Sequence, residues 1–362
     1  MEKIQTSLLG EDYYHNQMEK FPRTRYQGSK LKIINWIWDS IKDIEFDSAI
    51  DLFGGTGSVS YLFKANGKRV IYNDILKFNS IVGKAIIENN DTILNSEEVE
   101  ELFLEHEQYN YKTIIEDNFK DIFYTDEENR WLDIVVTNIM NMKNDKKQAI
   151  AWFALFQSCI SKRPYNLFHR ANLYMRTQEV KRSFGNKATW DTPFEVHFRN
   201  FVNEANNSVF DNGQRCVSIN YDVKDIPLDN FKTDLVYIDT PYISAKGIGT
   251  DYLDFYHFLE GMVDYNNWEE KILTKYKHKC IIGKGENRWT KKQEIYNAFD
   301  EVFNKYKDSI LVVSYRADGI PSENEILELL KKYKPNVKEV CAKEYKYALA
   351  KNDTKELLFI AY

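Results

Sequence analysis

A glycine-rich turn between a predicted strand and a predicted helix constrains the fold of this chain more than any other segment. The short run Ser48-Ala49-Ile50 leads into Asp51-Leu52-Phe53-Gly54-Gly55-Thr56-Gly57-Ser58, and a helix-like stretch follows from Val59 to Lys64. Glycines allow a backbone to approach a ligand closely, and the free amide groups that open a helix favour a negatively charged group. The unit therefore predicts an α/β sheet with a nucleotide-type loop at the end of one strand.

The next predicted strand ends in an acid that is placed to hold a ribose. The run Arg69-Val70-Ile71-Tyr72 is followed by Asn73-Asp74, and Asp74 lies seventeen positions after Gly57. That spacing is close to the one expected for an acid that binds ribose hydroxyls. A nicotinamide dehydrogenase carries a similar unit, but the loop here lacks the later glycine of the GxGxxG fingerprint, so a dehydrogenase ranks low.

A second polar cluster follows a predicted buried strand near residue 240. The apolar run Leu235 to Ile238 ends directly in Asp239-Thr240-Pro241-Tyr242. In open α/β sheets ligands gather at the carboxyl ends of the strands, so this cluster is a site candidate. Taken alone, the tetrapeptide also fits a common strand-to-turn exit, because Asp and Pro are frequent turn residues.

A lysine near the amino end of the chain also stands at an unusual position. The segment Arg25 to Lys30 precedes an amphipathic helix pattern, and Ser29 is placed to cap that helix. Lys30 then lies near the helix start, where a positive charge opposes the helix dipole. An anionic partner explains it, and a solvated surface lysine is the alternative.

Together, these motifs resemble the Dam-type, alpha-group DNA adenine methyltransferases. The resemblance covers most of the chain, and its order is characteristic: the amino-end motif precedes the glycine loop, and a long insert precedes the tetrapeptide. It implies a Rossmann-like α/β fold dependent on S-adenosylmethionine, with a catalytic domain in residues 1–95 and 208–362 and a mainly helical, loop-rich target-recognition insert in residues 96–207. The motifs that carry the resemblance are Tyr26 to Lys30, Asp51 to Gly57, Asn73-Asp74, Asp239 to Tyr242, Ser309 to Gly319 and Glu356 to Ile360.

The resemblance implies S-adenosylmethionine as the cofactor and no metal. Lys30 would pair with the methionine carboxylate beside Tyr26, and Asp74 would hold the ribose. Asp51, Phe53 and Gly55 would surround the methionine moiety, and Asp222 would lie near the adenine of the cofactor. The implied cofactor-binding residues are Tyr26, Lys30, Asp51, Phe53, Gly55, Asp74, Asp222 and Asp239.

The implied reaction is methyl transfer to the N6 amino group of an adenine that is flipped out of double-stranded DNA. The Asp239 carboxylate and the carbonyl of Thr240 would accept the amino hydrogens, and Tyr242 would stack on the base, with Pro241 completing the catalytic tetrapeptide. The family more often has Pro at the position of Thr240, but a backbone carbonyl serves from either residue. We interpret Thr240 as a variant that the catalytic site tolerates. The implied protein is a site-specific DNA methyltransferase of a restriction-modification system, and a cognate endonuclease is its candidate partner. The alternatives are a DNA-binding protein that does not methylate, and a methyltransferase of RNA.

The net charge of −6 is unevenly distributed along the 362 residues. From Glu88 to Glu128 acidic residues exceed basic ones by twelve, which favours a solvated face turned away from DNA. From Ile160 to Trp190 basic residues exceed acidic ones by six, with aromatic residues between them. This stretch predicts a loop-rich DNA-binding module, although each residue alone also fits a wet surface. The candidate DNA contacts are Lys162, Arg163, Arg170, Arg176, Lys181, Arg182 and Lys187.

Composition limits the remaining classes. With 43% hydrophobic and 29% charged residues the chain is typical of globular proteins. Its four scattered cysteines form no CxxC pair, so we expect reduced thiols, a cytoplasmic location and no zinc site. The longest apolar stretch, Ala149 to Ile160, is too short to cross a membrane and predicts a buried helix.

The pattern after the basic stretch predicts the rest of the catalytic fold. We expect a helix over residues 191–207 and strands at 215–219 and 234–238. Beyond these we expect a helix over 252–276, a strand at 279–282, a helix over 291–299, a strand at 310–314, a helix over 323–333 and a final pair of strands.

Overall fold

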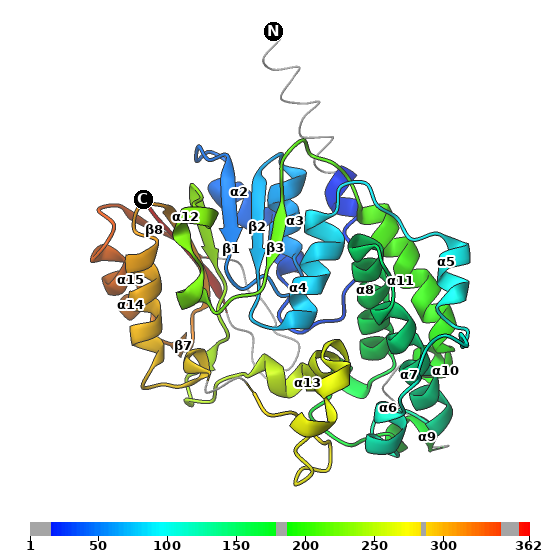
Figure 1. Cartoon of the computed structure of the whole chain (residues 1–362). Helices are drawn as coiled ribbons and strands as arrows, with labels where there is room; N and C mark the ends of the chain where they lie inside the picture. Colours follow the sequence, from blue (N-terminus) through cyan, green and yellow to red (C-terminus); the bar gives the residue numbers. More distant parts are fainter. Residues whose placement is uncertain (1–15, 179–186, 284–286, 342–354) are drawn as a thin grey trace.

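A computed structural model of the chain describes residues 16–178, 187–283, 287–341 and 355–362. Its centre is a seven-stranded sheet with the strand order β3-β2-β1-β4-β6-β9-β8 (Figure 1). A two-stranded sheet of β5 and β7 lies beside it. The strands are β1 (Ser48–Asp51), β2 (Arg69–Asn73), β3 (Val217–Ile219), β4 (Leu235–Ile238), β5 (Ile243–Ser244), β6 (Ile310–Arg316), β7 (Gly319–Ile320), β8 (Val337–Cys341) and β9 (Glu356–Ala361).

The order of the strands creates one switch point in the sheet. The chain runs outward from β1 to β2 and β3 and then returns, so that β4 pairs with β1 on its other side. These strands and β6 are parallel, whereas β9 pairs antiparallel with β6 and with β8. Both the glycine loop after β1 and the tetrapeptide after β4 leave the sheet at this switch point, where open α/β sheets bind ligands.

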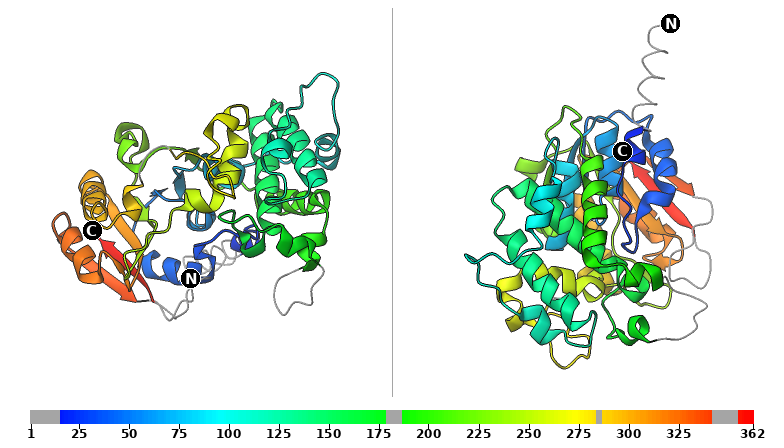
Figure 2. Two further views of the ribbon diagram at one scale, coloured as in Figure 1. Left: turned by 90° about the horizontal axis from the view of Figure 1, so that it is seen from below. Right: turned by 90° about the vertical axis from the view of Figure 1, so that its right-hand side faces the viewer.

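Alternating residues of the strands contact two separate cores. Tyr72 and Tyr237 point to one face of the sheet, while Ile71 and Val236 point to the opposite face. Figure 2 shows the sheet between these layers. The first face is covered by α2 (Ile34–Ile41), α3 (Ser58–Ala65) and α4 (Lys77–Gly83), and the second by α14 (Ile295–Lys305) and α15 (Glu323–Lys331).

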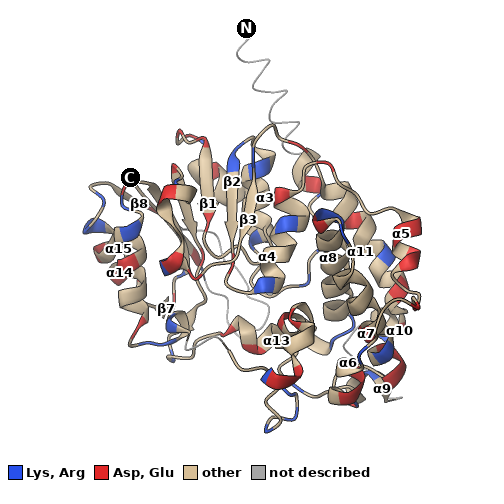
Figure 3. Cartoon of the chain, in the orientation of Figure 1, with Lys and Arg blue, Asp and Glu red and all other residues tan. Residues whose placement is uncertain are grey.

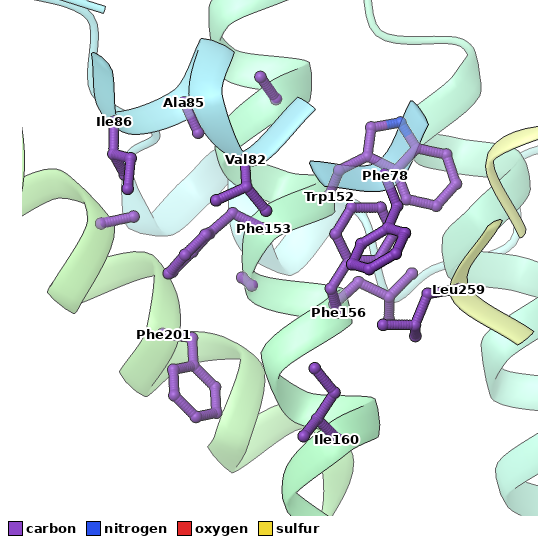
Figure 4. Packing of buried hydrophobic residues seen from close by; sticks show 14 of the residues in the cluster. Phe78, Val82, Ala85, Ile86, Trp152, Phe153, Phe156, Ile160, Phe201 and Leu259 are labelled. Atoms are coloured by element: carbon purple, nitrogen blue, oxygen red, sulfur yellow. The ribbon is translucent and has the colours of Figure 1, made fainter. Parts of the chain in front are cut away.

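The region between β2 and β3 is helical and extends the first core. Helix α8 is buried from Ala149 to Ser161, which confirms the predicted buried helix. Figure 4 shows Phe153 of α8 between Val82 and Phe201, and Phe156 beside Phe78, with the ring centroids of Phe156 and Phe78 5.6 Å apart. The helices are α5 (Ser96–Glu101), α6 (Ile114–Asn118), α7 (Asp126–Met140), α8 (Asp145–Ser161), α9 (Tyr174–Thr177), α10 (Lys187–Asp191) and α11 (Phe194–Ser208).

The remaining helices are short except for α13, which lies below the sheet in Figure 1. They are α12 (Leu228–Phe231), α13 (Tyr252–Val263), the π-helical turn η2 (Lys84–Glu88), and the 3-10 turns η1 (Lys30–Ile33), η3 (Pro164–Asn166), η4 (Val223–Asp225), η5 (Tyr265–Asn267), η6 (Glu269–Lys271) and η7 (Arg288–Thr290). The predicted insert boundaries, residues 96 and 207, lie at the start of α5 and near the end of α11.

Two sequence predictions after residue 250 are wrong. The predicted helix 252–276 ends at Val263, because the chain folds back and the Trp268 indole packs directly on Gly261, where a side chain would meet it at 2.0 Å. The predicted strand 279–282 contributes only an isolated bridge between Ile272 and Ile281. The left-handed backbone of Lys279, with φ of 49°, interrupts an extended run, and β6 occupies the place beside β4.

Three of the four cysteines, Cys159, Cys216 and Cys280, are buried free thiols. Within the described ranges, no helix is both long and apolar enough to cross a membrane. Nor do these ranges contain a group of three or more side chains that could hold a metal ion.

Candidate active site

Four of the sequence motifs line one cavity at the switch point of the sheet. Its empty space is about 800 Å³, counted out to its open mouth. The segment Tyr26 to Lys30, the glycine loop, Asp74 and the tetrapeptide all contribute, together with the first turn of α13. Residues far apart in the sequence therefore meet in one place, and seven of the eight candidate cofactor residues line this cavity.

Asp51 ends β1 with a carboxylate that is only half satisfied. Its Oδ2 accepts a hydrogen bond of 2.8 Å from the Ser60 hydroxyl, whereas its buried Oδ1 has no partner among the described residues. Burial raises the pKa of Asp51 to about 7, although the Ser60 hydrogen bond opposes this. An acceptor that is buried and unpartnered fits a cationic donor group of a ligand.

Asp74 holds the glycine loop in place from the neighbouring strand. Its Oδ2 accepts from the Gly55 amide at 2.9 Å, and its Oδ1 accepts from the Leu76 amide at 2.8 Å. Burial raises its pKa to about 6, and these amide hydrogen bonds oppose the rise. The loop also packs closely, because a side chain on Gly54 would meet the Tyr72 ring at 2.1 Å.

Lys30 is buried and is bonded to the predicted catalytic acid. Its Nζ lies 2.8 Å from both Asp239 carboxylate oxygens and 2.7 Å from the Tyr242 hydroxyl. The lysine therefore lines the cavity as predicted, but its ammonium already has anionic partners within the protein. Its second anionic partner is Glu356 of β9, whose Oε1 is 3.3 Å away.

Glu356 is a site residue that the sequence reasoning missed. Its side chain is fully buried, and its Oε1 accepts a 2.6 Å hydrogen bond from Ser314 and lies 2.8 Å from the Tyr242 hydroxyl. The available signals were its place at the start of an apolar strand and its membership of the segment Glu356 to Ile360, which carries part of the family resemblance. A charged residue there is unusual, because charged side chains are almost never fully buried unless they are paired.

Stacked tyrosines contribute to the wall of the cavity. Tyr26 stacks on Tyr256 with ring centroids 4.4 Å apart and on Tyr252 at 5.5 Å. Tyr252 also lines the cavity, and its hydroxyl lies over Gly28, where a side chain would meet it at 2.5 Å. Sequence reasoning missed Tyr252 because a tyrosine that opens a helix resembles ordinary core residues.

Asp222 lies apart from the other predicted cofactor residues. It caps the turn η4 by accepting a hydrogen bond from the Lys224 amide, and it lines a separate small pocket beside Arg288 and Lys305. The expectation that it lies near the adenine of a cofactor in the main cavity is therefore not supported. Phe53 does line the main cavity, and Trp289 packs edge-on against its ring at 5.0 Å.

Three of the predicted DNA-contacting residues are buried, which corrects that expectation. Lys162, Arg163 and Arg176 are at most 7% exposed. Lys162 and Arg176 form ion pairs with Glu128 at 3.0 and 2.6 Å. Arg163 donates to the carbonyls of Phe123, Leu167 and Arg170 and to Asn172.

These buried Lys and Arg side chains stabilise the local structure of their own segment. The Arg163 side chain donates to the Leu167 carbonyl across a tight turn in which Tyr165 and Asn166 have positive φ angles of 62° and 60°. Such backbone persists only where surrounding contacts impose it. The turn is fastened to α13, because the Phe168 amide donates to the Phe255 carbonyl at 2.9 Å.

The other candidate DNA contacts have different positions. Arg170 and Lys187 are exposed, and Lys187 forms an ion pair with Asp191. Lys181 and Arg182 lie outside the described residues. Figure 3 shows acidic residues gathered on α5, at the outer edge of the helical region away from α13, and basic residues on the loop after α13. That loop carries the exposed Lys275 and Lys277, which the sequence reasoning missed.

Comparison with known proteins identifies the family. Residues 26–334 match the model of the D12 class N6 adenine-specific DNA methyltransferases. The chain is 30% identical over 353 residues to Type II methyltransferase M2.HphI of Haemophilus parahaemolyticus, covering 94% of this chain and 98% of the relative. It is 26% identical to M.FokI of Planomicrobium okeanokoites and 25% identical to modification methylase StsI of Streptococcus sanguinis, over 85% and 92% of its own length, but it spans only about half of either relative. The chain therefore belongs to the D12 class N6 adenine-specific DNA methyltransferase family.

Proposed function

We propose that this adenine-specific DNA methyltransferase binds S-adenosylmethionine in the main cavity and presents the N6 amino group of an adenine to it at Asp239. The observation that carries the proposal is the meeting of three groups in one cavity: the glycine loop, the unpartnered carboxylate oxygen of Asp51, and the acid and carbonyls of the tetrapeptide. Bound there, the cofactor supplies an electrophilic methyl group on a sulfonium.

The walls of the cavity divide the cofactor contacts between two acids. Asp51 Oδ1 accepts from the ammonium of the methionine moiety, since that oxygen has no hydrogen-bond partner among the residues that the structure describes. Asp74 faces the ribose hydroxyls while it keeps the Gly55 amide in place. Phe53 and Tyr26 contribute apolar surface on either side. Lys30 does not reach the methionine carboxylate in this assignment, because Asp239 and Glu356 hold it.

Asp239 and the Thr240 carbonyl activate the amino group. Its lone pair is delocalised into the adenine ring, and two acceptors draw the hydrogens toward themselves and restore a nucleophilic nitrogen. The negative charge of Asp239 also offsets the positive charge that develops on nitrogen. The Thr240 hydroxyl donates to the Pro241 carbonyl at 3.1 Å, which stabilises the turn where the family more often has a second proline.

The Tyr242 ring is held in a defined plane, which suits a stacking partner for a flipped base. Tyr315 packs edge-on against the Tyr242 ring with centroids 5.1 Å apart, and the Tyr242 hydroxyl accepts a hydrogen bond from Lys30 Nζ. A flipped adenine loses stacking in the duplex, at a cost of a few kcal/mol, and an aromatic ring partly offsets this loss.

Double-stranded DNA lies, in this proposal, across the face that carries the cavity mouth. The exposed Arg170 stands on the turn fastened to α13, and the first turn of α13 lines the cavity. Lys275 and Lys277 extend the basic surface on the loop after α13. These residues supply phosphate contacts, while Lys187 and the predicted Lys181 and Arg182 remain candidates. The Type II names of the relatives favour a restriction-modification role with a cognate endonuclease.

The decisive experiment uses S-adenosylmethionine with a radiolabelled methyl group. DNA of varied sequence is incubated with the protein, and its nucleosides are then separated. Label in N6-methyladenine is expected for the wild type and for the exposed control Asp229→Ala, and no label is expected for Asp239→Ala. Cofactor binding without transfer to any DNA would favour a binding-only protein, and transfer only to RNA would favour an RNA methyltransferase.

A further inference from the structure

The chain leaves the cavity after the tetrapeptide and returns to it through a short hairpin. Tyr242 and Asp251 both line the cavity, and the Thr250 amide donates to the Tyr242 carbonyl at 3.1 Å. Residues 243–249 between them form the hairpin. Two residues span at most about 7 Å, so Ile248 lies no farther than that from Thr250. The hairpin therefore begins and ends at the cavity wall, a few residues from Asp239.

The stem of the hairpin is fixed on two sides. Ile243 is buried, pairs with Ile320 of β7 and forms a bridge with Gly249. On the other side Gly249 packs closely against η7, because a side chain on it would meet the Thr290 carbonyl at 2.4 Å. These contacts hold the stem without any contribution from its tip.

The tip of the hairpin projects away from the rest of the protein. It is closed by its own hydrogen bonds, because the Ser244 amide donates to the Ile248 carbonyl at 3.0 Å and the Ser244 carbonyl accepts from the Gly247 amide at 2.8 Å. Gly247 has a φ of 77°, and a side chain on it would meet no atom of the described residues within 4 Å. The tip is therefore a preformed projection.

The tip presents an apolar side chain beside a cation. Ile248 is 68% exposed, more than any other large hydrophobic side chain in the described ranges, and Lys246 is exposed as well. A single exposed isoleucine is ordinary on a protein surface. Here, however, the isoleucine stands on a fixed stem that continues directly from the catalytic tetrapeptide. Duplex DNA is a matching partner, since phosphates attract the lysine and base steps accept apolar side chains as wedges.

A flipped adenine leaves a gap in the base stack and remains attached to its backbone beside that gap. With the adenine in the cavity at Asp239, the gap lies within reach of a projection from the cavity wall. An apolar side chain that enters the gap replaces part of the lost stacking and keeps the duplex from closing. The exposed Lys246 favours this polyanionic partner over an apolar protein surface.

We propose that Ile248 is a wedge that enters the base stack of the duplex next to the target adenine, and that Lys246 contacts a neighbouring phosphate. The inference rests on the proposed function of the cavity, because only an enzyme that takes its target base out of a duplex needs a wedge. The wedge acts on the opening of the duplex and has no part in the methyl transfer itself. Its contribution should therefore disappear where the target base is already unpaired.

The first test compares two DNA substrates that contain a sequence methylated by the wild type. In one the target adenine is paired with thymine, and in the other it faces an abasic site, which lowers the cost of flipping. Ile248→Ala is expected to reduce kcat/KM on the paired duplex by about 10- to 100-fold relative to the wild type, since the wedge offsets part of the unstacking cost. On the abasic substrate the variant should stay within about threefold of the wild type.

Two further variants and one measurement serve as controls. Ile248→Leu keeps an apolar side chain of the same volume and should retain at least about half of the wild-type kcat/KM on the paired duplex. Ile93→Ala removes an isoleucine that is 53% exposed in the loop before α5, and it should match the wild type on both substrates. Thermal unfolding of Ile248→Ala should also match the wild type, because truncation of an exposed side chain leaves no cavity.

Two results would overturn the proposal. Equal losses of Ile248→Ala on the two substrates would show that Ile248 acts on the site and not on the duplex. No loss on the paired duplex would show that its exposure serves another purpose, such as contact with a protein. Lys246→Ala should lower the salt slope of DNA binding by about 1, and an unchanged slope would refute the phosphate contact. If the wild type transfers methyl groups to no DNA, the proposed function itself fails, whereas each outcome above is measured against wild-type transfer.

Discussion

Asp51→Asn tests whether the ionised Asp51 carboxylate destabilises the folded protein in the absence of a ligand. Burial raises the pKa of Asp51 from 3.8 to about 7, a shift of about three units. One unit corresponds to about 1.4 kcal/mol, so ionised Asp51 destabilises the folded protein by about 4 kcal/mol above pH 7. Because the folded pKa is raised, the free energy of unfolding falls as pH rises from about 4 to about 7.

Asparagine has the same shape and no charge, so it removes this pH dependence. Chemical denaturation without cofactor at pH 5.5 and pH 8 measures the effect. Between pH 5.5 and the pKa of about 7, ionisation of Asp51 costs the wild type about 1.4 kcal/mol of stability per pH unit. The stability of the variant relative to the wild type is therefore expected to rise by about 2 kcal/mol between pH 5.5 and pH 8. At pH 8 the variant should be the more stable protein.

The same substitution should weaken cofactor binding, although it stabilises the folded protein. The variant loses the unpartnered carboxylate oxygen and is expected to bind S-adenosylmethionine at least about tenfold more weakly, since a charged hydrogen bond contributes about 1.5 to 3 kcal/mol. The exposed Asp211→Asn serves as a matched control and should alter neither quantity. If Asp51→Asn and the wild type have the same pH slope of stability, the reasoning about a buried carboxylate is refuted.

Other substitutions test the loop, the insert and the tetrapeptide. Gly54→Ala places a methyl group 2.1 Å from the Tyr72 ring, so thermal unfolding should show a loss of about 1 to 3 kcal/mol. Arg163→Ala leaves buried carbonyls without donors and should lower the free energy of unfolding by about 3 kcal/mol, whereas Arg170→Ala should leave stability unchanged but reduce the salt slope of DNA binding by about 1. Equal stability of these two arginine variants would contradict their assignment. Thr240→Val keeps the backbone carbonyl and should reduce kcat by less than about tenfold, and a complete loss of transfer would show that the hydroxyl itself is required.

Local pattern was sufficient for the parts of the fold that use short-range signals. The strand, glycine loop and helix around Gly55 form as predicted, because glycine placement and apolar spacing act within a few residues. Ser29 accepts a hydrogen bond from the Leu31 amide and so caps its helix as predicted. The prediction of a strand at residues 279–282 was wrong, because an apolar run joins a sheet only where a neighbouring strand has an unpaired edge.

Charge was the least reliable guide to the site. Arg163 and Arg170 are equivalent in the sequence, yet the first is buried under a turn and the second is exposed. Glu356 resembles any acid before a strand, and its role depends on Lys30, more than 300 positions earlier in the chain. A single sequence contains no signal for such a pairing, because partner and burial are set by strand order.

The sequence by itself determined the class of this protein. A glycine loop, an acid at the end of the next strand and the Asp239 tetrapeptide appear in an order that identifies an adenine methyltransferase, and the family match confirms it. Tertiary structure alone decided how these parts act on one another. The return of β4 to the side of β1 places Asp239 beside Asp51, and the antiparallel β9 brings Glu356 under Lys30. Electrostatic interactions depend on distance and burial, and both are properties of the folded chain.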